Sequence, residues 1–295
     1  RALQTPLEVS HLKAIGTQNA RRAVPEMLSL IARAREEGLD VMCDAYPYTA
    51  GSTQLIHVLP PEFQTGGTET LTKRLRDRAA REEMRARMET GSDFENITLL
   101  VGFENVVAIG LRTDEYRRFE GKSIAEIALS FGKDPYDALF DLLAAEKCEA
   151  GMIDYISDEE DLKAILRAPF SGVISDATYP GTGQVHPRVY GAFARLIETY
   201  VVREKVLTLE QAVHKVTLQA AERFSLAGKG KIEAGMDADL LLFAPEKIQE
   251  RGTYLAPRAC ASGFDEVFVL GERVIENGEY RGGSSGEMLG LRMEY

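Results

Sequence analysis

Two residues, His11 and Asp176, combine a reactive side chain with a position near the end of a predicted strand. His11 lies in a predicted strand over residues 7–12, and Asp176 ends another over residues 171–176. Parallel α/β folds place functional groups at this end of their strands. Metal ligation is therefore one interpretation of His11, and acid/base catalysis is one of Asp176. A structural histidine is the more common case for His11, and a capping or loop-ordering carboxylate fits Asp176 equally well.

Two tyrosines follow a third predicted strand, over residues 40–45. Tyr46 and Tyr48 alternate with Asp44, so the three side chains share a side if the strand geometry persists. Tyrosines at a strand mouth suit substrate binding. Aromatic residues also plug strand ends, so a structural turn is an equal alternative.

The remaining histidines and one arginine are weaker candidates. His186, Pro187 and Arg188 open a predicted helix that runs to residue 198, with proline in the first turn. Arg188 could bind a substrate carboxylate through two hydrogen bonds, although a lone arginine at a helix start more often packs at the surface. His57 lies in the apolar run 55–59, which favours packing over a site role, and His214 in a predicted helix receives no role.

Strand-like and helical patterns alternate from residue 7 to about residue 224, which predicts βα units and a parallel sheet. The four predicted strands are residues 7–12, 40–45, 151–156 and 171–176. Such a sheet could be half of an eight-stranded barrel or most of an open doubly wound sheet. Capping boxes are expected at Ser123, Ser157 and Thr208, and residues 71–88 read as one solvated helix inside an insertion. From residue 229 short strands predict a small β-rich domain, with strands at 231–235, 238–243 and 266–274.

Composition limits the classes of partner. The chain has 295 residues, 44% of them hydrophobic, which is enough for a substantial core. A net charge of −11 and a pI near 5.1 argue against nucleic acid and favour a small-molecule partner. Three scattered cysteines indicate neither a disulfide framework nor a zinc knuckle, so we expect a cytoplasmic protein. No apolar run approaches the ~20 residues of a membrane helix.

Five segments, taken in order, resemble one enzyme family. Residues 9–13, 44–53, 175–176, 186–193 and 235–240 are similar to those of the N-acyl-D-amino-acid deacylases, or D-aminoacylases, of the amidohydrolase superfamily. The resemblance covers essentially the whole chain. It implies an α/β fold that is the second half of a (βα)8 TIM-like barrel, residues 1–228 with an insertion at about 60–120. A small β-sandwich-type domain, residues 229–295, would follow.

The resemblance also implies zinc-dependent hydrolysis of an N-acyl-D-amino acid or a related acylated or dipeptide substrate. One or two zinc ions would polarise the amide and activate water, and Asp176 would move the proton to the leaving amine. His11 on the fifth barrel strand would be a zinc ligand, with His57 a weaker candidate. The implied substrate contacts are Tyr46, Tyr48, His186 and Arg188. The remaining ligands are expected from sequence before Arg1, in a missing N-terminal half of the same protein.

One departure from the family pattern keeps two alternatives open. Tyr46 stands where the sixth strand of family members can supply a histidine ligand, and tyrosine is a poor replacement for imidazole on zinc. A cyclic-amide hydrolase similar to dihydroorotases and hydantoinases is one alternative. A metal-free amidohydrolase-like scaffold is the other, and self-association into a homo-oligomer stays open in each case.

Overall fold

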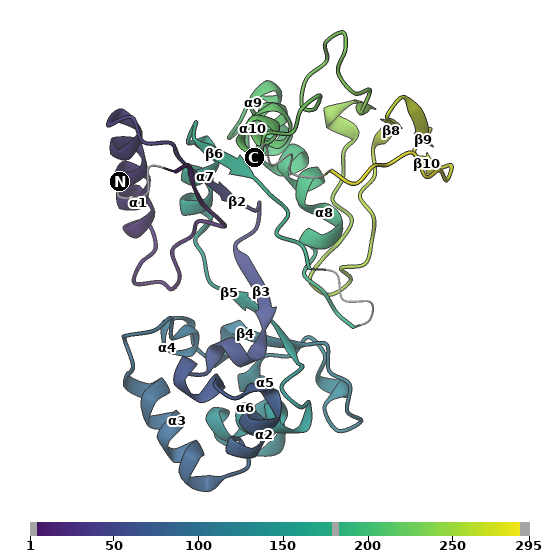
Figure 1. The fold of residues 1–295 in the computed structure, drawn as a ribbon. Helices are drawn as coiled ribbons and strands as arrows, with labels where there is room; N and C mark the ends of the chain where they lie inside the picture. The colour runs from purple at the N-terminus through teal and green to yellow at the C-terminus, as the bar shows by residue number, and fades with distance from the viewer. Residues whose placement is uncertain (1–4, 179–182, 290–295) are drawn as a thin grey trace.

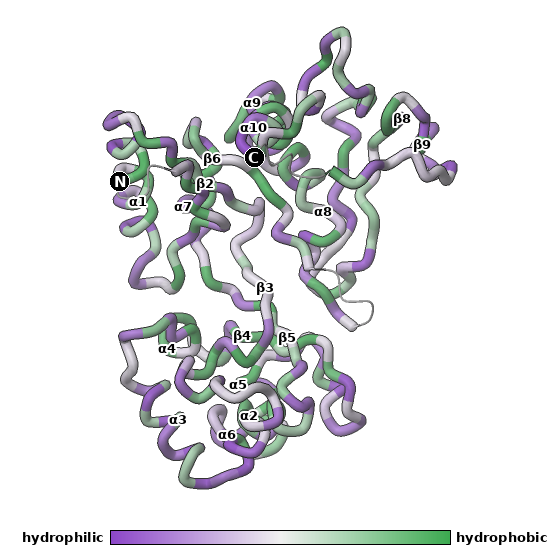
Figure 2. The backbone as a smooth tube through the Cα atoms, in the orientation of Figure 1, coloured by the Kyte–Doolittle hydropathy of each residue, from purple (hydrophilic) through white to green (hydrophobic). Residues whose placement is uncertain are grey.

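The computed structural model describes residues 5–178 and 183–289. Figure 1 shows two parts, an upper one with a parallel sheet and most of the C-terminal half, and a lower one built from the middle of the chain. In Figure 2 hydrophobic stretches lie along β4 and β5 of the lower part, whereas β3 is pale and much of the helix α3 is hydrophilic. None of the described helices has the length and apolarity needed to cross a bilayer.

The upper part contains a parallel sheet in the order β1-β2-β6. Leu7 of β1 pairs with Val41 of β2, and Cys43 of β2 pairs with Ser171 of β6. Helices α1 and α7 pack against each other and against β2, as in successive βα units. The bounds are β1 Leu7–Val9, α1 Ala23–Glu36, β2 Val41–Ala45, α7 Glu159–Arg167 and β6 Ser171–Val173.

The prediction that residues 151–156 form a fourth parallel strand is wrong. The strand exists as β5 (Gly151–Tyr155), but it lies between β3 (Ala50–Gln54) and β4 (Val106–Ile109) in an antiparallel sheet. An apolar run identifies a buried strand without identifying its neighbours. The sequence did not predict β3, because the strand is polar and its buried positions are filled by alanine and glycine.

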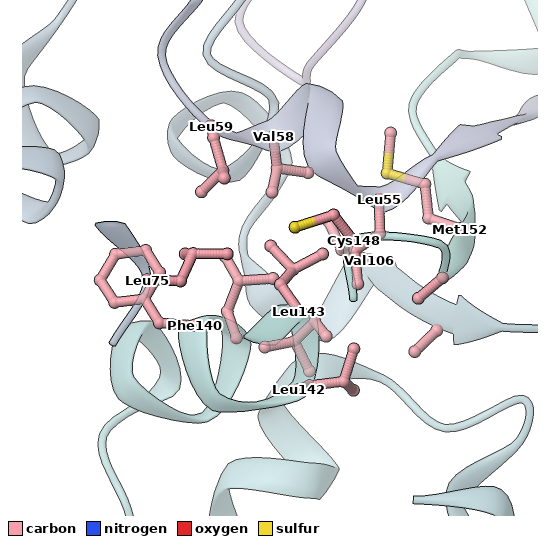
Figure 3. Packing of buried hydrophobic residues seen from close by; sticks show 14 of the residues in the cluster. Leu55, Val58, Leu59, Leu75, Val106, Phe140, Leu142, Leu143, Cys148 and Met152 are labelled. Atoms are coloured by element: carbon pink, nitrogen blue, oxygen red, sulfur yellow. The ribbon is translucent and has the colours of Figure 1, made fainter. Parts of the chain in front are cut away.

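The lower part is completed by five α-helices around a hydrophobic core, part of which Figure 3 shows. Their bounds are α2 Gly67–Arg74, α3 Arg78–Thr90, α4 Ile97–Val101, α5 Ile124–Phe131 and α6 Pro135–Ala145.

The expected solvated helix over residues 71–88 is instead two helices with buried faces. The first ends at Arg74, and Asp77 caps the second, its carboxylate accepting a hydrogen bond from the Ala80 N–H at 2.9 Å. Leu71 and Leu75 are at most 1% exposed, and Met84 and Met88 are fully buried. Each helix thus packs on the core through one pair of apolar residues spaced by four.

The capping predictions have mixed outcomes. Ser123 and Thr208 form the expected capping boxes with Glu126 and Gln211. At the start of α7 the cap is Asp158 rather than Ser157, because the Asp158 carboxylate accepts hydrogen bonds from the backbone N–H groups of the first turn. Aspartate caps as well as serine does, so the two adjacent residues competed for one position.

Glu146 ties the loop after β4 to the end of α6. Its buried carboxylate accepts hydrogen bonds from the backbone N–H groups of Arg112 and Thr113 at 2.9 and 3.1 Å, and from the Thr113 hydroxyl. Glu146→Ala would leave these donors unsatisfied, so we expect it to lower the free energy of unfolding by about 2–4 kcal/mol in urea titrations. Glu149→Ala, which removes only an exposed ion pair with Arg112, should change it by less than about 1 kcal/mol. Equal losses in the two variants would contradict this role.

The C-terminal region combines helices with a four-stranded antiparallel sheet in the order β10-β9-β8-β7. The predicted strand at 231–235 is absent, and the one at 266–274 is a hairpin with a turn at Leu270 and Gly271. The bounds are α8 Arg188–Arg195, a π-helical segment Leu196–Arg203, α9 Leu209–Val216, α10 Leu218–Arg223, β7 Leu240–Phe243, β8 Phe264–Val269, β9 Glu272–Glu276 and β10 Glu279–Tyr280.

Candidate active site

A cavity of about 720 Å³ lies where the ends of the parallel strands meet the antiparallel sheet of the lower part. Segments far apart in sequence supply its walls: the residues after β1, β2 and β6, the start of α8, and parts of β3 and β5. Five of the seven predicted site residues line it, namely His11, Tyr46, His57, Asp176 and Arg188.

Asp176 and Arg188 form an ion pair in this cavity. Asp176 lies beyond the end of β6 with φ of 49°, in the left-handed region that is uncommon for residues other than glycine. Arg188 Nη1 lies 2.9 Å from Asp176 Oδ2, and Nη2 donates to the Ser52 carbonyl at 3.1 Å. The guanidinium also lies over the Tyr46 ring, 4.6 Å from its centre. The Arg188 side chain is 3% exposed and is held by three contacts, so it can fix the orientation of the Asp176 carboxylate.

His11 also adopts a positive φ, of 42°, and is held by its neighbours. Its N–H donates to Asp44 Oδ1 at 2.5 Å, and the Lys13 ammonium lies 2.7 Å from its carbonyl oxygen and 3.1 Å from its Nδ1. An ammonium can only donate, so in this arrangement Nδ1 accepts and a neutral ring carries its proton on Nε2. Binding a metal through either nitrogen requires Lys13 to leave this position or the tautomer to change. Burial lowers the pKa of Lys13, although Asp176 and Asp154 oppose the shift.

His57 does not pack in the core. It lies in the one-turn helix Leu55–Val58, where Leu55 and Val58 are buried and the imidazole is exposed along the cavity. Across residues 5–178 and 183–289, no three His, Cys, Asp or Glu side chains are grouped so that they could hold a metal ion. A catalytic zinc site normally has three protein ligands, so the described residues supply at most part of one.

His186 supports Arg188 from outside this cavity. It is 2% exposed, its Nε2 lies 3.0 Å from the Ala50 carbonyl oxygen, and its Nδ1 accepts from the Arg188 backbone N–H at 3.0 Å. Burial, helped by the Arg188 charge, lowers the pKa of His186 to about 3, so the ring is neutral. It lines a neighbouring cavity of about 840 Å³, but both ring nitrogens already have protein partners.

Of the two tyrosines, Tyr46 lines the 720 Å³ cavity and Tyr48 does not. The Tyr48 N–H donates to the Tyr46 carbonyl at 2.9 Å, so the chain turns sharply after β2 and strand alternation ends. Tyr46 faces the 720 Å³ cavity, whereas the Tyr48 hydroxyl donates to Glu250 Oε1 at 2.6 Å. Burial raises the pKa of both phenols, so both hydroxyls keep their protons.

Asp154 of β5 lines the cavity, whereas the sequence predicted it only as part of a strand. It is 3% exposed, and Oδ1 has no hydrogen-bond partner in the described part of the chain. Burial raises the pKa of this carboxyl to about 6, although Lys13 and Arg188 partly oppose the shift and Glu95 adds to it. The signal in the sequence was a single acidic residue in an otherwise apolar strand, which needs a partner or a purpose.

The raised pKa of Asp154 predicts a pH-dependent stability. The folded protein holds this proton more tightly than the unfolded chain, so the stabilisation is complete below the ordinary aspartate pKa of 3.8 and is lost as pH rises through about 6. Asp154→Asn should therefore raise the free energy of unfolding by roughly 2–3 kcal/mol at pH 8 and change it little at pH 3.5. Urea titrations of the two proteins at both pH values measure this. A variant that is destabilised at pH 8 would show that Lys13 and Arg188 outweigh burial.

Comparisons with known proteins place this fold beside those of known enzymes. The amidohydrolase family model matches residues 113–256. D-aminoacylase of Alcaligenes xylosoxydans xylosoxydans is 31% identical over 291 residues, which are 98% of this chain and 49% of that protein. A crystal structure of D-aminoacylase superposes with a TM-score of 0.73 at 29% identity, covering 96% of this chain and 49% of that one.

A second solved structure is N-acyl-D-glutamate deacylase from Bordetella bronchiseptica, complexed with zinc and a phosphonate that mimics the tetrahedral intermediate. It matches with a TM-score of 0.69 at 28% identity, over 93% of this chain and 48% of that chain. The chain thus spans about half the length of the relatives it matches, with the mixed α/β fold of D-aminoacylase. It carries an amidohydrolase domain, and the proteins it resembles are D-aminoacylase and the N-acyl-D-glutamate and N-acyl-D-aspartate deacylases.

Proposed function

We propose that this chain supplies one side of an active site that hydrolyses the amide bond of N-acyl-D-amino acids, with Asp176 as the acid/base. The observation that carries the proposal is the Asp176–Arg188 pair in a cavity that Lys13 and Tyr46 also line. A carboxylate fixed by a buried guanidinium at a strand end is suited to moving a proton from water to a leaving amine. The relatives named above, all deacylases of N-acyl-D-amino acids, support the same reaction.

The substrate's own carboxylate would be held by the cations of the cavity. Lys13 lies 5.3 Å from the centre of the Tyr46 ring, and Arg188 lies over the same ring. Lys13, Arg188 and the Tyr46 hydroxyl are donors around one space, and an α-carboxylate accepts from such groups. We assign His186 and Tyr48 to positioning instead, because their polar atoms are bonded to Arg188, Ala50 and Glu250.

Zinc is the metal we propose for this site, with His11 as the ligand that this chain contributes and His57 as a second candidate. Bound zinc would polarise the scissile carbonyl and lower the pKa of a water molecule. Since the described residues contain no three-ligand group, the other ligands would come from sequence outside this chain, as the half-length match to the relatives supports. Asp176 would accept the proton of the attacking water at a carboxylate oxygen and return it to the amine nitrogen.

The architecture belongs to the same proposal. The parallel strands β1, β2 and β6 would be part of an eight-stranded (βα)8 barrel, and the lower part would be an insertion in it. Residues 229–295, with the sheet β7–β10, would form a separate small domain. The TM-scores against the deacylase structures support this placement.

The test uses the full-length protein, a panel of N-acetyl-D-amino and N-acetyl-L-amino acids, and metal analysis. We expect zinc in the purified protein, hydrolysis of D substrates, and loss of both hydrolysis and zinc on treatment with a chelator. Hydrolysis of dihydropyrimidines or hydantoins in place of the acylated amino acids would replace the proposal with cyclic-amide hydrolysis. A protein without metal and without hydrolysis of either class would indicate a scaffold.

A further inference from the structure

The cavity carries acidic side chains as well as cations. Lys13 and Arg188 reach it from the segment after β1 and from the start of α8, whereas Asp154 lies on β5 and Glu95 lies just before α4. These charges act on Asp154: the cations Lys13 and Arg188 lower its pKa, and the anion Glu95 raises it. In the proposed function the cations bind the carboxylate of the substrate, and Asp176 acts at its amide. Asp154 and Glu95 have no role in it.

Asp154 is the unsatisfied member of this group. Its Oδ1 is closed to solvent and has no hydrogen-bond partner among the residues that the structure describes, although the side chain borders the cavity. Lys13 attracts it without forming a hydrogen bond, and burial still dominates the pKa. A buried polar atom without a partner lowers stability, which points to a partner that arrives with the ligand.

The opposite strand leaves room for this carboxyl. Gly51 of β3 pairs directly with Asp154, and a Cβ at position 51 would lie 2.6 Å from Asp154 Oδ1 and 3.0 Å from Ile156 Cδ1. Gly51 has an ordinary extended backbone, so strand geometry does not require glycine there. With any other residue at position 51, the Asp154 carboxyl would have to move. The two strands are therefore fitted to an acid at this point of the cavity wall.

We propose that Asp154, together with Glu95, binds a cationic group on the substrate's side chain, so that the site selects N-acyl-D-amino acids with an ammonium or guanidinium. This inference rests on the proposed function. A substrate of this kind carries a carboxylate for Lys13 and Arg188 and a hydrogen-bond donor for Asp154, so it complements both sets of charges in the cavity. An acidic side chain would meet Asp154 and Glu95 instead, and like charges at short range are unfavourable.

The experiment compares three substrates in the full-length protein: N-acetyl-D-lysine, N-acetyl-D-norleucine, which lacks the ammonium, and N-acetyl-D-glutamate. For the unmodified protein we expect kcat/KM to be at least about 10-fold higher for the lysine substrate than for the norleucine one. Asp154→Asn should remove most of this preference by lowering kcat/KM for the lysine substrate, while kcat/KM for the norleucine substrate changes less than about 3-fold. Glu95→Gln should give a smaller loss, since Glu95 is exposed.

Two further variants keep the result interpretable. Asp114→Asn removes an equal charge at a side chain that is fully exposed and should leave the preference unchanged. Gly51→Ala should displace the Asp154 carboxyl and reduce the preference as Asp154→Asn does, with thermal unfolding confirming that the protein is folded. A preference for norleucine or glutamate, or an equal loss on all three substrates in Asp154→Asn, overturns the inference and leaves the proposed function intact. Failure to hydrolyse any of the three would instead overturn the proposed function and this inference with it.

Discussion

Asp176→Asn is expected to lower kcat by about 10²- to 10⁴-fold, the usual contribution of a positioned acid/base. The amide has the size of the carboxylate but can neither accept the proton of water nor return it to an amine. Arg188 approaches Asp176 Oδ2 at 2.9 Å, so the asparagine can keep a hydrogen bond through its carbonyl oxygen and the pocket should keep its shape. The measurement is kcat at saturating N-acetyl-D-amino acid with the full-length protein.

Two controls separate chemistry from folding in this experiment. Asp265→Asn changes an aspartate that, among the residues the structure describes, forms only a long ion pair with Lys247, at 3.9 Å, and kcat should stay within about 2-fold of the original. Thermal unfolding of Asp176→Asn should remain cooperative, since the neutral residue still fills its position. A variant that retains more than a tenth of kcat would remove Asp176 from the acid/base role.

The strands before His11 and Asp176 could be predicted from the sequence because they depend on local signals, although each ends three residues earlier than predicted, at Val9 and Val173. Both residues therefore follow their strands instead of ending them, and both line the same cavity. Parallel strands with their carboxyl ends at one edge bring such residues together without further information. Arg188 was proposed only as the less favoured alternative to a surface arginine, yet it is buried and lines the cavity.

The parts of the site that the sequence did not predict depend on contacts between distant segments. Asp154 enters the cavity only because β5 pairs with β3 and places it opposite Gly51, and no local pattern around residue 154 reveals that pairing. Tyr48 departs from the expected strand alternation for a related reason. A turn just beyond the strand ends its alternation, and the partner of the hydroxyl, Glu250, lies in a remote segment.

Arg188→Met should raise KM for an N-acetyl-D-amino acid by at least about 10-fold and lower kcat as well. The KM effect follows from losing a donor to the substrate carboxylate, and the kcat effect from freeing the Asp176 carboxylate that the guanidinium orients. Arg188→Lys should recover little, because one ammonium cannot reach Asp176 and the Ser52 carbonyl together while lying flat on the Tyr46 ring. Arg203→Lys, a conservative change at an exposed arginine, should leave both constants unchanged.

The double variant Arg188→Met with Asp176→Asn distinguishes the two parts of this role. If Arg188 affects kcat by orienting Asp176, the double variant should have the kcat of Asp176→Asn alone, because an arginine cannot orient a base that is absent. Its KM should still be raised, since the contact with the substrate carboxylate does not depend on Asp176. Additive losses in kcat would mean that the guanidinium stabilises the transition state directly, and an unchanged KM would mean that Lys13 and Tyr46 hold the substrate carboxylate without it.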